Sequence, residues 1–301
     1  MTRLTPPKAC IACGSQPRRS LRLTNEHALS RCPQCGLGWW EWADFEPAEL
    51  YGQGYFQSAE CCQGYNDYAA LEPGLRRTAR DRLERIDSVR PGWDRSNVSR
   101  PARRLLDVGC GTGVFLDEAA RLGWEVEGLE VSEYAANVAR RRNLRVQSGA
   151  IETANFAAAS YDCITLWDVI EHLRDPAGVL ASAAAALRPG GVLALSTGDL
   201  NATVARLSGR RWHLFTLPEH LFFFTTASLR ALLARVGLTV ARVTREVYWA
   251  PLGYLVERLA KMFGRPAPPS CQALNGIILP ATLFDVIGIY AVRRAARQAG
   301  T

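Results

Sequence analysis

The sequence predicts an α/β fold in which helices cover a doubly wound parallel sheet, preceded by a small cysteine-rich module. Two observations predict the sheet: apolar runs alternate with helical segments from residue 104 to 197, and the first run ends in a glycine-rich turn. Two Cys-X-X-Cys pairs within the first 35 residues predict the separate module. At roughly 150 residues per domain, 301 residues have room for both parts.

The composition is that of a globular protein, with 48% hydrophobic and 22% charged residues, and excludes disordered and collagen-like chains. The formal net charge is +7, and most of the excess lies between Arg76 and Arg104. We expect no signal peptide and no spanning helix, because the longest apolar stretch is broken by Pro280 and Asp285. Nine cysteines do not fit a disulfide framework, so we expect a cytoplasmic protein with reduced or metal-bound thiols.

The N-terminal cysteines Cys10, Cys13, Cys32 and Cys35 have the spacing of a zinc ribbon. Each pair is followed by a glycine, which suits a tight knuckle, and two knuckles place four thiolates at the corners of a tetrahedron around Zn²⁺. Four sulfur ligands leave no position for water, so the predicted site is structural. Two disulfides or four unrelated thiols are the alternatives, and a ribbon by itself does not identify a partner.

Residues 46–100 are predicted to join the ribbon-like module, residues 1–45, to a main domain over residues 101–301. The aromatic-rich segment 39–56 is interpreted as packing between the two parts; the alternative is cation–π contact with a cationic ligand. The arginine-rich stretch that begins near Arg76 carries apolar residues three to four positions apart. This pattern predicts an amphipathic helix with a solvated basic face.

The main domain is predicted from its alternation of short strands and helices. We expect strands at 104–109, 124–131, 144–148, 161–169 and 191–197, and helices at 114–122, 133–142 and 177–187.

The first strand ends in Asp107-Val108-Gly109-Cys110-Gly111-Thr112-Gly113. Glycines at a strand-to-helix turn let the backbone approach a ligand closely. Glu130 follows 21 residues after Gly109, at the end of the second strand, where a carboxylate can bind both hydroxyls of a ribose. A dinucleotide fingerprint would need glycine in place of Val114, and an acid at Asp107 suits an ammonium group better than a pyrophosphate.

These segments resemble a known family. LLDVGCGTGVF, GLEVSEYA, YDCITLWDVIEHLRDP and LRPGGVLALST resemble successive motifs of class I S-adenosylmethionine-dependent methyltransferases, and PEHLFFFTTASLRALLARVGL is similar to the segment before their penultimate strand. The resemblance covers residues 100–250 and implies a Rossmann-like seven-stranded sheet whose last strand lies within 285–293. The fourth-strand segment resembles the ubiquinone- and sugar-methylating branches. The ribbon followed by an aromatic segment resembles a bacterial subgroup associated with polysaccharide, glycolipid or secondary-metabolite synthesis.

The resemblance also implies a set of S-adenosylmethionine-binding residues. They are Asp107, Gly109 and Gly111 at the methionine end, Glu130 at the ribose, Val131 and Ile151 beside adenine, and Trp167 and Asp168 beside the sulfonium. The family commonly has an acid after the third strand that binds the adenine amino group. This chain has Ser148-Gly149-Ala150 there, so Glu152 or backbone atoms would make that contact.

Methyl transfer is an in-line displacement for which the protein mainly supplies alignment and exclusion of water, with a base only where the nucleophile loses a proton. His172 and His220 follow strands at their carboxyl ends, where open α/β sheets bind ligands, and are the candidate bases. The alternatives are that His172 braces a loop and that His220 packs. Glu171 and Glu219 are weaker candidates, and His27 is expected on the surface.

The segment 198–215 and the insert 249–283 flank this edge and are expected to form a substrate lid. Apolar residues from 252 to 263 have the spacing of an amphipathic helix. We interpret its apolar face as core packing or a homodimer contact, and a lipid-linked substrate or peripheral membrane contact is the alternative.

Three functions fit the sequence. We favour a methyltransferase that acts on a small molecule, sugar or glycolipid, at oxygen or nitrogen. The second is an RNA methyltransferase whose ribbon and basic stretch track phosphates, although the fourth strand lacks the Asn-Pro-Pro-aromatic turn of exocyclic-amine methylases. The third is a non-catalytic S-adenosylmethionine-binding scaffold that docks a partner through its ribbon.

Overall fold

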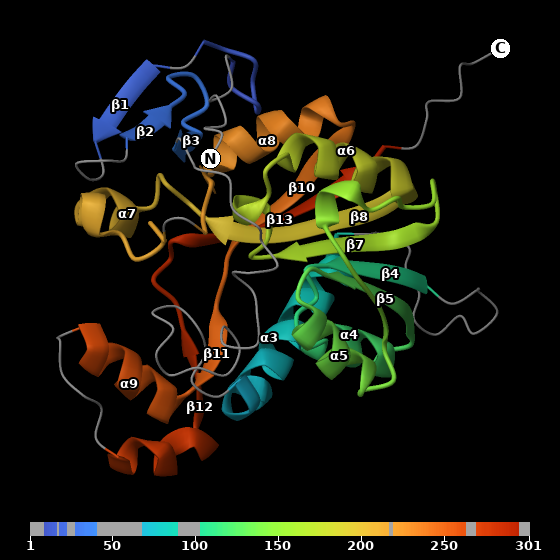
Figure 1. The fold of residues 1–301 in the computed structure, drawn as a ribbon, viewed down its shortest axis with the longest axis vertical. Coiled ribbons are helices and arrows are strands. Elements are labelled where there is room, and N and C mark those ends of the chain that lie inside the picture. The colour runs from blue at the N-terminus through green and yellow to red at the C-terminus, as the bar shows by residue number, and fades with distance from the viewer. Residues whose placement is uncertain are drawn as a thin grey trace.

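The computed structural model describes residues 9–16, 18–22, 28–40, 68–89, 103–216, 219–262 and 269–294. A central sheet carries helices on both faces, with a small N-terminal sheet beside α8 and an extension that contains α9 at the opposite end (Figure 1). His27 and residues 41–67, which include most of the aromatic-rich segment, lie outside the described residues, so the predictions made for them stay predictions.

Within the described residues, seven strands form the main sheet in the order β10-β13-β8-β7-β4-β5-β6. Their bounds are β4 (Arg103–Val108), β5 (Trp124–Glu130), β6 (Arg145–Ser148), β7 (Tyr161–Trp167), β8 (Leu187–Gly198), β10 (Leu238–Arg245) and β13 (Val286–Arg293). The strands from β6 to β8 pair in parallel, which confirms the predicted doubly wound sheet. Strand β13 is antiparallel to both neighbours, because the chain returns from β10 along the same edge of the sheet without crossing a face.

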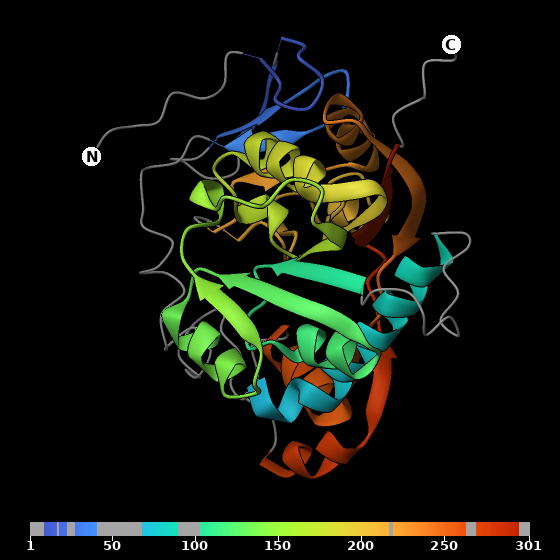
Figure 2. The same ribbon diagram turned by 90° about the vertical axis from the view of Figure 1, so that its right-hand side faces the viewer.

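Helices cover both faces of the sheet, which is seen most directly when the two views are compared (Figures 1 and 2). One face carries α3 (Tyr68–Ser88), α4 (Val114–Arg121) and α5 (Glu133–Arg140), and the other carries α6 (Pro176–Ala186) and α8 (Thr226–Arg235). Local sequence signals explain where several of these helices begin. Ser132 and Asp175 cap α5 and α6 with their side chains, and Thr225 forms a capping box with Ser228 at the start of α8.

The amphipathic helix predicted in the arginine-rich stretch is α3, but the expectation of a solvated basic face was wrong for part of that face: Arg77 and Arg80 are exposed, whereas Arg82 is buried. Arg76 forms ion pairs with Glu72, Asp117 and Glu118, and Arg82 is 7% exposed. The helix lies across α4 and the insert, where carboxylates from distant segments meet its arginines. A sequence pattern shows which residues share a helix face but not what that face packs against.

The N-terminal sheet is continuous with the main domain. It consists of β1 (Arg18–Arg22), β2 (Ala28–Arg31), β3 (Gly38–Trp40) and β9 (Phe222–Phe223), all antiparallel. Because β9 comes from the loop before α8, the module and the main domain share one sheet. They also share one hydrophobic core, in which the buried Leu37 and Trp39 belong to the same cluster as Phe222 and Leu229.

The insert between β10 and β13 forms a two-stranded sheet with helices. It contains β11 (Tyr248–Pro251), α9 (Leu252–Met262), the 3₁₀ helix η4 (Pro269–Gly276) and β12 (Ile278–Ala281). The amphipathic helix predicted here is therefore confirmed as α9. Large apolar side chains of this region are exposed, namely Leu259, Ile277, Leu279, Leu283 and Phe284. None of the helices described by the structure is long and apolar enough to span a membrane.

Candidate functional site

The glycine-rich turn lies between β4 and α4 and has a backbone that side chains would disrupt. Gly109, Gly111 and Gly113 all have φ between +54° and +79°. A Cβ on Gly109 would lie 2.5 Å from Cγ2 of Val169, and the Gly109 amide donates a 2.7 Å hydrogen bond to the carbonyl of Leu129. The turn therefore offers close approach to its backbone and is held in place by the neighbouring strand.

Asp107 is a buried carboxyl that faces the cavity above this turn. It accepts a 2.6 Å hydrogen bond from the Thr165 hydroxyl, and it is 2% exposed. Burial raises the pKa of Asp107 to about 7, and no ion pair joins it to a cation within the described residues. A ligand that brings an ammonium group would supply the missing positive charge. The carboxyl of Asp107 therefore fits the ammonium group at the methionine end of S-adenosylmethionine.

Glu130 ends β5 beside the turn and is fixed by backbone amides. One carboxylate oxygen accepts a 2.7 Å hydrogen bond from Gly111, and the other accepts a 2.9 Å bond from Ser132. Glu130, Val131 and Ile151 are not among the residues that line the cavity described next, so their predicted contacts with ribose and adenine stay predictions. The Glu152 carboxylate accepts a hydrogen bond from the Arg174 amide.

A cavity of about 640 Å³ opens at the carboxyl ends of β4, β7 and β8. Nine of the residues predicted from the sequence line it: Asp107, Gly109, Gly111, Trp167, Asp168, His172 and His220, and the weaker candidates Glu171 and Glu219. Residues that the sequence did not reveal line it as well, including Arg82 of α3, Tyr248 of β11 and Arg258 of α9. The lining of the cavity thus includes residues of the helix before the sheet and of the insert.

Arg82 contacts several other residues of this cavity. Its guanidinium lies 4.2 Å from the ring centroid of Trp167 and forms ion pairs with the fully buried Glu246, at 3.1 Å, and with Asp168, at 3.6 Å. Asp168 has φ of +56° and also accepts hydrogen bonds from the hydroxyls of Ser196 and Tyr248. The two residues predicted to lie beside the sulfonium are therefore held by one arginine from another part of the chain.

His172 and His220 contact each other in the cavity wall, with ring centroids 4.6 Å apart. Nδ1 of His172 lies 3.0 Å from the carbonyl of Glu219, and Nδ1 of His220 lies 2.8 Å from the carbonyl of Leu214. A carbonyl oxygen only accepts, so each Nδ1 carries the proton and each Nε2 keeps its lone pair. Burial lowers the pKa of His172 to about 4 and the pKa of His220 well below its usual value, so both rings are neutral at pH 7.

Glu171 completes this group. It is buried, and one of its carboxylate oxygens has no hydrogen-bond partner in the described part of the chain. Burial, with a smaller contribution from Asp168, raises the pKa of Glu171 to about 8, which keeps the carboxyl protonated at neutral pH. The ligand atoms of Glu171, His172 and His220 lie within 4.8 Å of one another. Such a set can move a proton or hold a divalent cation.

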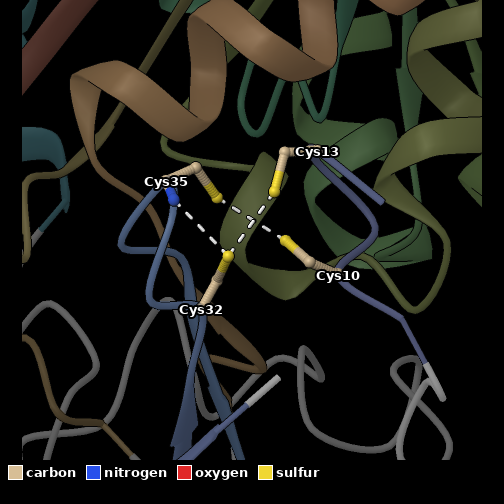
Figure 3. A group of neighbouring side chains, drawn as sticks. All are labelled: Cys10, Cys13, Cys32 and Cys35. Carbon is tan, nitrogen blue, oxygen red and sulfur yellow. Dashed lines mark hydrogen bonds between the residues drawn. The ribbon is translucent and has the colours of Figure 1, made fainter. Parts of the chain in front are cut away.

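The four N-terminal cysteines come together as predicted, with their sulfur atoms pointing toward one centre (Figure 3). Sγ of Cys10 lies 3.5 Å from Sγ of Cys35, and Cys13 and Cys32 are separated by the same distance. Sulfurs about 2.3 Å from a central zinc are about 3.8 Å apart in a tetrahedron, close to these separations. In both knuckles the following glycine amide donates to the carbonyl of the first cysteine, at 2.8 and 3.0 Å. The donor set fits a structural Zn²⁺.

Comparison with known proteins identifies the main domain. A family model described as "Methyltransferase domain" matches residues 63–243. The chain is similar to ubiquinone biosynthesis O-methyltransferases: 30% identical to that of Thiobacillus denitrificans over 179 residues, and 33% identical to that of Aeromonas salmonicida over 185 residues. These matches cover 55% and 56% of this chain and 77% of each relative.

A solved structure supports the fold alone. It is a chain of the complex between the Haloferax volcanii Trm112 methyltransferase activator and a candidate methyltransferase. This chain is similar to it with a TM-score of 0.50 and 17% identity, over 74% of this chain and 94% of that chain.

Proposed function

The chain belongs to the methyltransferase-domain family, and from this premise we propose that it methylates a hydroxyl group of a small-molecule, sugar or glycolipid acceptor. It is a class I S-adenosylmethionine-dependent methyltransferase. The relatives named above are O-methyltransferases of ubiquinone biosynthesis, which supports transfer to oxygen. The acceptor itself is the part that we propose.

The observation that carries this proposal is the pair of neutral imidazoles in the cavity that also contains the glycine turn. A hydroxyl acceptor must lose a proton as the methyl group arrives, and a base within reach lowers that barrier. Because each Nδ1 donates to a carbonyl, the basic nitrogen of each neutral ring is Nε2. We assign the proton acceptor to this pair, with His172 beside Asp168 and His220 on the loop before β9.

The residues at the turn would hold the cofactor. Bound S-adenosylmethionine supplies a methyl carbon that is already activated for displacement. Asp107 would bind the ammonium group, Gly109 and Gly111 would let the methionine end approach the backbone, and Glu130 would accept from the ribose. Val131 and Ile151 would flank adenine, while Trp167 and Asp168 would lie beside the sulfonium.

We further propose that Cys10, Cys13, Cys32 and Cys35 bind a structural Zn²⁺. The converging sulfurs and the paired knuckles support this assignment. Zinc would stabilise a segment that is too short to build its own core.

The RNA alternative loses support from the arginines of α3. Arg76, Arg80, Arg82 and Arg85 each form ion pairs with carboxylates of the same chain. Phosphates would have to compete with these pairs. The exposed apolar residues of the insert could instead serve a lid, a homodimer contact or the binding of a lipid-linked acceptor.

A labelling experiment tests the acceptor class. The purified protein is incubated with methyl-labelled S-adenosylmethionine and extracts of the native host from which its gene has been deleted, and the extract is then separated into RNA, protein, lipid, glycan and small molecules. We expect label in the small-molecule, glycan or lipid fractions. Label that ribonuclease removes would overturn the proposal in favour of RNA, and no label despite cofactor binding would favour a scaffold.

A cation at Glu171, His172 and His220 is the alternative role for this cluster, and dialysis distinguishes the two. After dialysis against a chelator, the protein is reloaded with one equivalent of Zn²⁺ to refill the cysteine site. Full activity at one equivalent supports proton transfer by the histidines, whereas activity that needs a second equivalent of a divalent cation would assign the cluster to a cation instead.

A further inference from the structure

Trp40, the last residue of β3, connects the cysteine module to a candidate catalytic histidine. Its indole Nε1 donates a 2.7 Å hydrogen bond to the backbone carbonyl of His220. The tryptophan is 3% exposed, so water does not compete for this bond. A single residue of the module therefore reaches the loop that carries His220.

Two further links tie the same loop to the module. Phe222 and Phe223 of β9 pair with Trp39 and Gly38 of β3. The Thr225 hydroxyl, which caps α8, donates a 2.7 Å hydrogen bond to the carbonyl of Cys35. Residues 220 to 225 are thus bonded at both ends and at the centre to a segment that begins at one of the four clustered cysteines.

These links affect the position of the His220 ring because the other hydrogen bonds of His220 also hold it in place. Its amide donates to the carbonyl of Thr216, and its Nδ1 donates to the carbonyl of Leu214. The next residue, Leu221, donates from its amide to the carbonyl of Glu171. With the carbonyl of His220 held by Trp40, a displacement of β3 would move the ring relative to His172 and the cavity.

The glycine turn is held differently. The Gly109 amide bonds to Leu129 of β5, and the nearest atoms around Gly109 and Gly113 belong to Val169, Leu144 and Ala139. These contacts come from the main sheet and its helices. Displacement of the module would leave them in place.

We propose that the cysteine module acts through Trp40 as a positioning element for His220, so that metal loading of the four cysteines governs methyl transfer without governing binding of S-adenosylmethionine. The proposal rests on the role assigned to His220 under the proposed function. It makes the module a part of the acceptor site rather than a separate docking domain. Trp40 is a positioning residue, since its side chain acts through the backbone of His220.

The chain offers a matched pair of variants for the test. Trp40→Phe removes the Nε1 donor and keeps an aromatic ring. Trp39→Phe makes the same change one residue earlier, where Nε1 has no hydrogen-bond partner among the described residues. Both tryptophans are buried, so the two variants lose similar packing. A difference between them in the signals of His220 reports the bond to His220.

Two readouts separate positioning from folding. Ring nitrogen signals of ¹⁵N-histidine are followed by NMR, which is practical because the chain has four histidines, and His220→Gln assigns the signal of interest. Calorimetry measures the Kd for S-adenosylmethionine. We expect Trp40→Phe to shift or broaden the His220 signals, to leave the Kd unchanged, and to lower kcat about tenfold in the labelling assay. Trp39→Phe should retain the wild-type His220 signals.

Removal of the metal from the wild-type protein by a chelator, with metal content measured, is the second arm and applies even if Trp40→Phe does not fold. The same change in the His220 signals, with an unchanged Kd, supports the proposal. Unchanged His220 signals in folded Trp40→Phe or in the metal-free protein would overturn it. Absence of methyl transfer by the wild-type protein would count against the proposed function only, because the NMR arm needs no acceptor.

Discussion

The two walls of the cavity are built in different ways. The wall with the glycine turn comes from Asp107, Gly109 and Gly111, and the turn is held by hydrogen bonds from its own amides to Leu129 and Glu130 of the adjacent strand. The second wall, as we define it, combines the side chains of His172 and His220 with those of Arg82, Tyr248 and Arg258, drawn from α3, two loops and the insert.

This difference separates binding of the cofactor from selection of the acceptor. A backbone turn held by its own sheet keeps the same shape for one cofactor whatever the neighbouring segments do. Substitutions in a wall of side chains from distant segments can change which acceptor fits. The geometry of such a wall depends on every contact that brings those segments together. We therefore expect changes on the second wall to affect stability and transfer, and changes on the first to affect cofactor affinity.

Arg82→Met should give the largest effect on stability. The variant leaves Glu246 buried without its closest cation, and breaking a buried pair from one side costs roughly 3–5 kcal/mol. Urea unfolding measures the change. Arg80→Met is the control on the same helix: its side chain is 56% exposed, and loss of its pair with Glu118 should cost less than about 1 kcal/mol. Equal losses in the two variants would contradict the central place given to Arg82.

Gly109→Ala should act on the other wall. The new Cβ would lie 2.5 Å from Cγ2 of Val169 at a φ of +73°, so the turn must distort. We expect the affinity for S-adenosylmethionine to fall roughly a hundredfold, or about 2.7 kcal/mol. Gly123→Ala carries a similar φ of +83° with no atom within 4 Å of the new Cβ, and its affinity should match the wild type. Calorimetry compares the two.

The pH dependence of cofactor binding gives a smaller effect. Burial raises the pKa of Asp107 to about 7, so the ligand-free protein holds this proton below pH 7, whereas binding of an ammonium group requires the ionised form. Affinity should therefore rise about tenfold per pH unit up to pH 7 and level off above it. Asp107→Asn should bind weakly and lose this slope. A slope that persists in the variant would assign the titration to another group.

The parts that could be predicted from sequence are those whose residues lie close together in the chain. The four cysteines form two local knuckles, and the turn from Asp107 with Glu130 belongs to one strand–helix–strand unit, so spacing alone indicated both. Position at the ends of strands then indicated His172 and His220, and the resemblance indicated Trp167 and Asp168. In each case a local feature of the chain, a knuckle, a turn or the end of a strand, indicated where the residue would lie.

The rest depended on contacts between distant segments. Arg82 meets Glu246 across 164 positions, and Trp40 meets His220 across 180. No periodicity marks such pairs. The same reason explains the wrong expectation for the basic face of α3, since the carboxylates of Glu118 and Glu246 come from other elements. The antiparallel direction of β13 likewise follows from the path of the insert.

The central claim is that one wall binds the cofactor while the histidine pair serves the acceptor. The most direct test measures both activities in the double variant His172→Gln/His220→Gln: calorimetry with S-adenosylmethionine, and methyl transfer to the fraction labelled by the wild type. The account predicts wild-type cofactor affinity with transfer lowered by roughly 10²- to 10⁴-fold, the usual contribution of a general base. Transfer at the wild-type rate, or loss of cofactor binding together with transfer, would contradict it.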